Sequence, residues 1–143
     1  MMRWIRQSRA RDDRGAAAVE FAFVAIPLIT LLLGIIDFGW IFNQQVSLAN
    51  AAREAARYYA VNEHDATTAT ARTSLKTAAE SYGEGMAPSI DWSAGGVTLT
   101  DLCGASPSRV EAVAEIDMPS LTGFFDAILG PDLFGTGETI CGG

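Results

Sequence analysis

The sequence contains few of the residues from which catalytic and metal sites are built. Its 143 residues include a single histidine, His64, and two cysteines. No cysteine or acidic cluster accompanies His64 at a metal-ligand spacing, so a turn residue is its expected role. No nucleophile stands beside a base in a recognisable motif, and no two carboxylates have a defensible spacing for acid–base catalysis. We therefore expect no enzyme activity and no catalytic, cofactor-binding or metal-binding residues.

Phosphate-binding loops are also missing from the sequence. The segment Gly135-Thr136-Gly137-Glu138 lacks the lysine and the spacing that such a loop requires. We expect no nucleotide site, no nucleic-acid partner and no small-molecule substrate.

Charge is scarce and unevenly distributed. Charged side chains make up 19% of the chain, and the net charge is −7. Residues 1–15 hold five arginines and two aspartates, a net of +3, so the other 128 residues together carry −10. Residues 21–36 hold no charge at all. The chain is therefore not a uniformly acidic soluble protein, because it divides into a basic, an apolar and an acidic part.

The apolar run is long enough to cross a membrane. With its flanks it extends over residues 16–42, interrupted only by Glu20 and Asp37, and as a helix it would cover about 40 Å. A bilayer core needs about 20 residues. The alternative is a cleaved secretory signal, whose apolar region has roughly 7–15 residues with a cleavage site directly after it. The only candidate site, Ala49-Asn50-Ala51, lies farther along inside a helical pattern, so we predict a retained membrane helix.

Arginines indicate the orientation of this helix. Five precede it, whereas only Arg53 and Arg57 follow it within the next twenty residues. The positive-inside rule places the N-terminus in the cytoplasm and the chain after about residue 42 on the far side of the membrane, with a single crossing. Arg53 and Arg57 lie one helical turn apart. They could form a basic stripe for lipid headgroups or an acidic neighbour, but we favour a solvated face beside Glu54.

The two cysteines fall in the part of the chain that we expect to be exported. Cys103 and Cys141 would be exposed there to an oxidising environment. No further cysteine and no usefully spaced histidine joins them, which favours a disulfide over a metal site. In the chain-entropy view, closing this loop would contribute about 4 kcal/mol to stability.

Glu20 does not suit a passive membrane anchor. A carboxylate inside the hydrocarbon costs at least roughly 2.5–3.5 kcal/mol on insertion scales, and such residues usually mark a function. The alternative is that Glu20 lies near the cytoplasmic interface, six residues from Arg14, and reaches the headgroups or is protonated.

The residues around Glu20 favour a function. The segment RGAAAVEF at residues 14–21 places a glycine after a basic segment and a glutamate five residues beyond it. This resembles the class III signal of prepilin peptidases, which is cut after the glycine on the cytoplasmic side. The resemblance implies a cut between Gly15 and Ala16 and identifies Glu20 and Phe21 as assembly residues. Glycine suits the cut, because it has no side chain to obstruct a protease groove.

The resemblance is broader than this signal. Residues 14–60 are similar to the N-terminal half of TadE-like proteins, minor pseudopilins of the tight-adherence (Tad, or Flp) pilus system. The matching features are the RGxxxVEF opening, Pro27 early in the apolar run, GIIDFG at residues 34–39 and AAREAAR at residues 51–57. Relatives often carry a glycine where this chain has Ala55-Ala56, and a helix tolerates either.

The resemblance implies a component that acts in Tad pilus assembly and cell adhesion or secretion. A new ammonium at Ala16 would pair with Glu20 of a neighbouring subunit and set the register between subunits, because an unpaired buried charge is strongly disfavoured. The implied partners are inner-membrane lipid, the prepilin peptidase, other pilin or pseudopilin subunits and the Tad assembly platform. The alternative function is an uncleaved single-pass membrane protein whose exported domain binds a partner.

The residue pattern predicts an α+β fold led by one long, pilin-like helix. Pro27 should kink this helix without ending it, and helical spacing continues after Asp37 to about residue 61. The inward residues expected in its second half are Val46, Ala49, Ala52, Ala56 and Tyr59, with Gln44, Asn50, Arg53 and Arg57 on the polar side. A second helix is expected over residues 66–82, with Asp65 as its N-cap, Ala71, Leu75, Ala78 and Tyr82 on one face, and Gly83 and Gly85 at its end.

The last third of the chain reads as a small antiparallel sheet. Ile90 and Trp92 alternate with polar residues, Ala94-Gly95-Gly96 is a plausible turn, and residues 97–100 and 110–116 alternate again. The outward charges of the third run would be Glu111, Glu115 and Asp117. Thr139-Ile140-Cys141 would form a last edge strand that brings Cys141 to Cys103.

A short apolar helix is expected over residues 121–129, stopped by Gly130-Pro131. Its apolar side chains would pack on the sheet or, alternatively, form a subunit-contact patch: Phe124, Phe125, Ile128 and Leu129. The sequence thus predicts four segments. They are a basic cytoplasmic leader (1–15), a membrane helix (16–42), a periplasmic helical region (43–87) and a small exported β-rich region (88–143).

Overall fold

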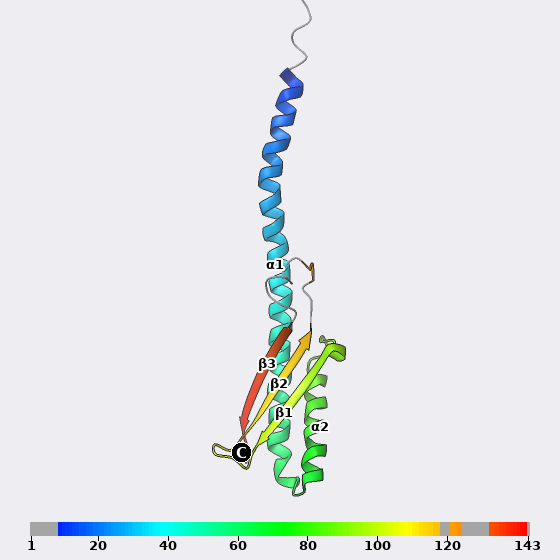
Figure 1. Ribbon diagram of the computed structural model, residues 1–143, viewed down its shortest axis with the longest axis vertical. Helices are drawn as coiled ribbons and strands as arrows, with labels where there is room; N and C mark the ends of the chain where they lie inside the picture. The colour runs from blue at the N-terminus through cyan, green and yellow to red at the C-terminus, as the bar shows by residue number, and fades with distance from the viewer. Residues whose placement is uncertain (1–8, 118–120, 124–131, 143) are drawn as a thin grey trace, which may run out of the picture.

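The protein consists of a long helix that extends well beyond a small folded head (Figure 1). The computed structural model describes residues 9–117, 121–123 and 132–142. The order of elements is α1 (Arg9–Asn62), a 3-10 turn (Glu63–Asp65), α2 (Ala69–Gly85), a second 3-10 turn (Trp92–Ala94), β1 (Gly95–Leu102), β2 (Arg109–Asp117) and β3 (Asp132–Ile140). This order confirms the predicted α+β fold. Residues 124–129 of the predicted short apolar helix lie outside the described residues.

Helix α1 has two halves with different surroundings. Its first half, up to about residue 36, projects beyond the head, and its second half forms the base on which the head is built (Figure 1). The helix continues through Pro27 without interruption. This agrees with a proline that removes one backbone donor but leaves the neighbouring turns intact.

The packed half of α1 is lined mainly by alanine. Its buried apolar residues are Leu48, Ala51, Ala52, Ala55, Ala56, Tyr59 and Ala60. The predicted inward face was wrong at two positions, because Val46 is 44% exposed whereas Gln44 is only 1% exposed.

Helix α2 packs closely against α1 through Gly83. A Cβ at Gly83 would lie 2.7 Å from both the Ala51 carbonyl oxygen and the Ala55 Cβ. Gly83 was predicted to end the helix, but it lies inside α2, and its missing side chain lets the two helices approach. Ala79 is the buried alanine of this face rather than the predicted Ala78.

The start of α2 also differs from the prediction. The N-cap is Thr68, whose hydroxyl accepts a hydrogen bond from the Ala71 N–H at 3.1 Å. Asp65, the predicted cap, belongs instead to the preceding 3-10 turn. That turn uses three residues to reverse the chain, which moves the helix start along to the next residue with a capping side chain.

The three strands form one antiparallel sheet in the order β1-β2-β3. Val97 lies opposite Ala114, and Ala114 lies opposite Gly135. Ile90 and Trp92 form no strand, and Gly95 and Gly96 begin β1 instead of making a turn. The inner face of the sheet packs on α1, where its buried residues include Val97, Leu99, Val110, Ala112, Ala114 and Ile116.

Strand β3 lies almost directly on the backbone of α1. A Cβ at Gly135 would lie 2.3 Å from the Ala49 nitrogen, and a Cβ at Gly137 would lie 2.5 Å from the Arg53 nitrogen. No side chain fits between the strand and the helix at these two positions. The segment rejected above as a phosphate loop therefore has a packing role, and it belongs to a strand of nine residues rather than to a short strand beginning at Thr139.

Candidate functional site

The projecting half of α1 is apolar and exposed. Phe21 and Phe23 are 74% and 77% exposed, and this pattern continues along the helix with Val24, Ile26, Leu28, Leu31, Leu32 and Ile35. A stretch of the helix is long and apolar enough to cross a membrane. Burying these side chains in lipid or against neighbouring helices would remove a large apolar area from water, which is the main favourable term in membrane insertion and in association. This surface requires an apolar environment that the head does not supply.

The residues that the sequence singled out for processing all lie on this projecting half. Gly15, Ala16, Glu20 and Phe21 are exposed and belong to α1. A Cβ at Gly15 would meet no atom within 4 Å. Glu20 lies one helical turn after Ala16, so the two residues share a face of the helix. Glu20 forms no ion pair with any residue whose side chain the structure describes.

Asp37 marks the point where α1 enters the head. It is 0% exposed, although it lies on a helix whose neighbours Ile35 and Ile36 are exposed. Its Oδ1 accepts the Thr122 backbone N–H at 3.1 Å, and its Oδ2 accepts the Thr122 hydroxyl. The only signal of this contact in the sequence is that Asp37 interrupts the apolar run. Its partner comes from far along the chain and could not be found from periodicity.

A second polar group lies two turns farther along α1. Gln44 is almost fully buried, and its Oε1 has no hydrogen-bond partner among the described residues. A buried acceptor without a partner is uncommon in folded proteins. Gln44 was expected among the polar residues of the helix, and the sequence pattern contains no sign of its burial.

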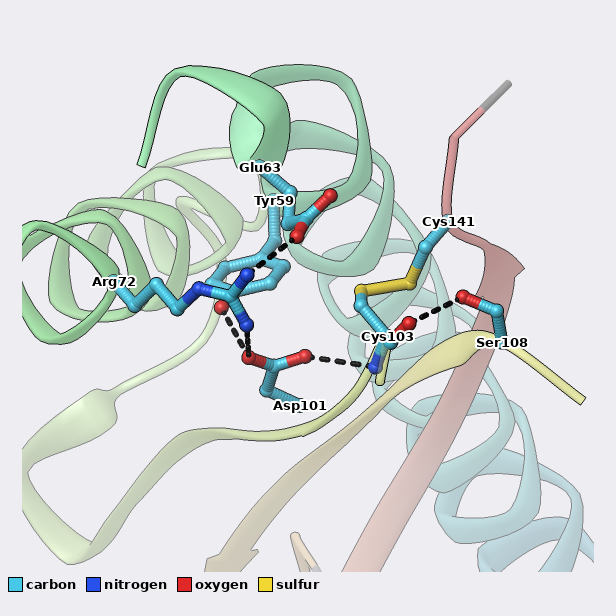
Figure 2. The surroundings of a disulfide bond; sticks show 7 residues. All are labelled: Tyr59, Glu63, Arg72, Asp101, Cys103, Ser108 and Cys141. Atoms are coloured by element: carbon cyan, nitrogen blue, oxygen red, sulfur yellow. Dashed lines mark hydrogen bonds and ion pairs between the residues drawn. A yellow bond between two sulfur atoms is a disulfide. The ribbon is translucent and has the colours of Figure 1, made fainter. Parts of the chain in front are cut away.

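The far end of the head is held by a network around a disulfide (Figure 2). Cys103 and Cys141 form this disulfide across a separation of 38 residues. The Cys103 N–H donates to Asp101 Oδ1 at 2.9 Å, and the Tyr59 hydroxyl donates to Asp101 Oδ2 at 2.7 Å. Arg72 lies 3.6 Å from Asp101 and 3.1 Å from Glu63. One carboxylate therefore links α1, α2 and the disulfide loop.

This network changes the acidity of Tyr59. Burial raises the pKa of Tyr59 to about 12, and the hydrogen bond to Asp101 and the charge of that carboxylate act in the same direction. The phenol is therefore neutral across the physiological pH range. Its role is to donate a hydrogen bond that holds α1 against β1.

Two glutamates of α2 cover the free edge of the sheet. Glu84 Oε1 accepts the Val97 N–H at 3.2 Å, and Glu80 Oε1 accepts the Leu99 N–H at 2.9 Å. These donors belong to β1, the edge strand next to α2 in Figure 1. Uncovered edge strands promote pairing with other chains, so the two carboxylates close this edge against strand addition.

The remaining candidate residues are exposed. Arg53 and Arg57 lie on the open side of α1, and Arg57 lies 3.9 Å from Glu54. His64 contacts Asp65 at 3.0 Å in the turn after α1. Within the described ranges, no group of three or more histidine, cysteine, aspartate or glutamate residues could hold a metal ion.

The long helix is also the part of the chain that resembles known proteins. The family model described as TadE-like protein matches residues 15–57. This segment is TadE-like. The match begins at Gly15 and ends at Arg57, so it includes the exposed apolar half of α1 and most of the half that carries the head. Neither the curated proteins nor the solved structures contain a match to this chain.

The TadE-like match confirms the resemblance noted in the sequence. It suggests a Tad pilus-associated component with a structural, non-enzymatic role that interacts with other pilus subunits. The membrane-compatible helix near the N-terminus agrees with a membrane-anchored component of this kind.

Proposed function

We propose that this chain is a minor pseudopilin that acts in the assembly of a Tad pilus. A prepilin peptidase removes residues 1–15 by cutting between Gly15 and Ala16 on the cytoplasmic side. The mature chain remains in the inner membrane through residues 16–42, with the head on the periplasmic side. Glu20 then pairs with the N-terminal ammonium of a neighbouring subunit.

The observation that carries this proposal is the position of Glu20. It is exposed on an apolar helix, has no partner among the side chains described, and lies within the TadE-like segment that begins at Gly15. A carboxylate in an apolar environment is strongly destabilising unless it is paired. A subunit ammonium at the same depth is a partner that only assembly provides.

The surroundings of Gly15 support the proposed cut. Gly15 is exposed, and no neighbouring atom would obstruct an enzyme that approaches it. Proteases bind their substrates in extended form, so the helix must unwind locally around the cut. Glycine favours this step, because it is about 1 kcal/mol less favourable than alanine in a helix interior.

The role of Glu20 can be tested with a neutral variant of nearly the same shape. Glu20→Gln removes the charge that pairs with the ammonium, and cells that carry only this variant should lose most surface pili in electron micrographs. Asp65→Asn, in the exposed turn after α1, also replaces a carboxylate by an amide; it is the control and should leave piliation unchanged. Normal piliation with Glu20→Gln would contradict the proposed pairing.

A further inference from the structure

The side of the sheet that faces away from α1 is open and acidic, and we call it the outer face. The strand register places the following residues on it: Thr98, Thr100, Arg109, Glu111, Val113, Glu115, Asp117, Asp132, Phe134, Thr136, Glu138 and Ile140. These include five carboxylates and one guanidinium. Phe134 is 60% exposed between the acids, although aromatic side chains are usually buried. Val113 and Ile140 are 39% and 77% exposed on the same face, so the outer face combines three exposed apolar side chains with its charges.

The acids on the outer face are only partly compensated. Arg109 forms ion pairs with Glu111 at 2.6 Å and with Glu138 at 3.3 Å, so one guanidinium is shared by two carboxylates. Asp132 lies directly opposite Asp117, whose hydrogen bond and charge raise the pKa of Asp132. Like charges opposite each other destabilise a sheet. A cationic partner would relieve this repulsion.

The open side of α1 carries the opposite charge. Val46, Asn50, Arg53 and Arg57 recur at three- and four-residue spacings and are all exposed, and we call them the basic stripe. Glu54, which contacts Arg57, is the one acid beside the stripe. The stripe therefore has a net charge of +1, and the row formed by Glu111, Glu138 and Arg109 has a net charge of −1.

The two surfaces lie at matching heights along α1. Gly137 lies against Ala52 and Arg53, so the next residue, Glu138, lies at the height of the two arginines. Gly135 lies against Leu48 and Ala49, so the preceding residue, Phe134, lies at the height of Val46. A strand of two residues and a helix of four residues have nearly the same length. The charged positions therefore correspond in height, and so do the apolar ones.

We propose that the outer face of one copy of this chain packs against the basic stripe of a second copy. Glu111 and Glu138 would lie opposite Arg53 and Arg57, and Phe134 would lie opposite Val46. Copies anchored in one membrane share their orientation and depth, so this pairing needs no axial shift between them. The inference rests on the membrane anchoring in the proposed function but not on cleavage of the leader.

The same geometry determines the kind of assembly. The basic stripe lies on the helix and the outer face on the far side of the sheet, so each contact uses two different surfaces. Such heterologous contacts repeat from copy to copy and form rings or open filaments rather than closed two-fold pairs. A second copy fits better than an unrelated acidic protein, because only a second copy presents both surfaces at the same depth.

Photo-crosslinking in intact membranes tests this contact. A photoreactive phenylalanine analogue replaces Asn50 in the full-length chain, which is co-expressed as two differently tagged copies. We expect adducts that carry both tags and map to residues 110–143, a single tryptic peptide that contains β2 and β3. The same analogue at Ser81, on the exposed side of α2, is the control and should give few adducts. Adducts with other proteins only, or no excess over the control, would overturn the proposal.

A charge exchange makes the test specific. Arg53→Glu with Arg57→Glu makes the stripe acidic, and Glu111→Lys with Glu138→Lys makes the row that these residues form with Arg109 basic. Each variant alone should lose the two-tag adduct by about fivefold or more, whereas co-expressing the two variants should restore it. Adduct formation should also fall as the salt concentration rises. Formation of the Cys103–Cys141 disulfide checks that each variant is folded, and failure of the mixture to restore the adduct would contradict the contact.

The outcomes for the two proposals can be distinguished. If the adduct forms while Met1 is retained, the contact between copies stands and the proposed processing fails. If the mature chain begins at Ala16 and no adduct forms, the processing stands and this contact fails.

Discussion

Thr122 donates two hydrogen bonds to Asp37, a residue 85 positions earlier in the chain. The contact ties the segment formed by residues 121–123, which lies between β2 and β3 in the chain, to α1. Asp37 is fully buried whereas Thr122 is exposed, so the two hydrogen bonds are partly shielded from water. A hydrogen bond to a charged group typically contributes about 1.5–3 kcal/mol to the free energy of unfolding.

Removing this carboxylate should loosen the segment locally. In Asp37→Ala, amide hydrogen exchange at Thr122 should accelerate by about 10-fold or more, with exchange at Leu99 in the sheet unchanged. Asp37→Asn keeps one acceptor oxygen and should have an intermediate effect. Thr30→Ala, which removes a hydroxyl that bonds only within α1 to Ile26, is the control. Equal exchange in wild type and Asp37→Ala would show that the contact does not hold the segment.

The glycines of β3 should not tolerate a side chain. In Gly137→Ala the new Cβ would lie 2.5 Å from the Arg53 nitrogen, so the strand must move away from α1. Overpacking of this kind costs about 1–3 kcal/mol, measurable as a lower free energy of unfolding in urea for the full chain in detergent. Gly85→Ala, where a Cβ meets nothing within 4 Å, should be neutral or slightly stabilising. A fully stable Gly137→Ala protein would mean that β3 does not lie on the helix backbone.

The raised pKa of Tyr59 predicts a loss of stability in strong alkali. The pKa of about 12 in the folded chain exceeds the ordinary value of 10.0, so folding favours the neutral phenol. The stabilisation is complete below pH 10 and is lost as the pH rises toward 12. The difference in unfolding free energy between wild type and Tyr59→Phe should therefore shrink over this range. Asp101→Asn, which removes the nearby charge, should weaken the pH dependence, and a constant difference would contradict this explanation.

The long helix could be predicted because its signals are local. The uncharged run and the three- and four-residue spacings that follow it predicted a helix over about residues 16–61, and α1 spans Arg9–Asn62. Of the three predicted outward charges of β2, Glu115 and Asp117 are exposed and Glu111 is half-buried on the same face. These features follow from the spacing of apolar and polar residues along the chain, which can be read without knowing any contact between distant segments.

The errors arose where contacts between distant segments decide the structure. Gly135 and Gly137 weaken any strand prediction, yet β3 forms there because the glycines permit direct packing on α1. Asp37 and Gln44 are buried by segments that helical periodicity cannot identify. Gly83 was predicted to end a helix, because its close contact with α1 depends on a distant segment and leaves no signal in the sequence around Gly83. The sites of closest approach were therefore the hardest to predict.

The N-terminus of the mature protein tests the central claim most directly. Intact mass spectrometry of the chain purified from membranes would be compared between cells with and without an active prepilin peptidase. We predict a chain that begins at Ala16 in the first case and at Met1 in the second, with Gly15→Leu blocking the change. A chain that keeps residues 1–15 while the peptidase is active would contradict the account and favour an uncleaved membrane protein with an exported binding domain.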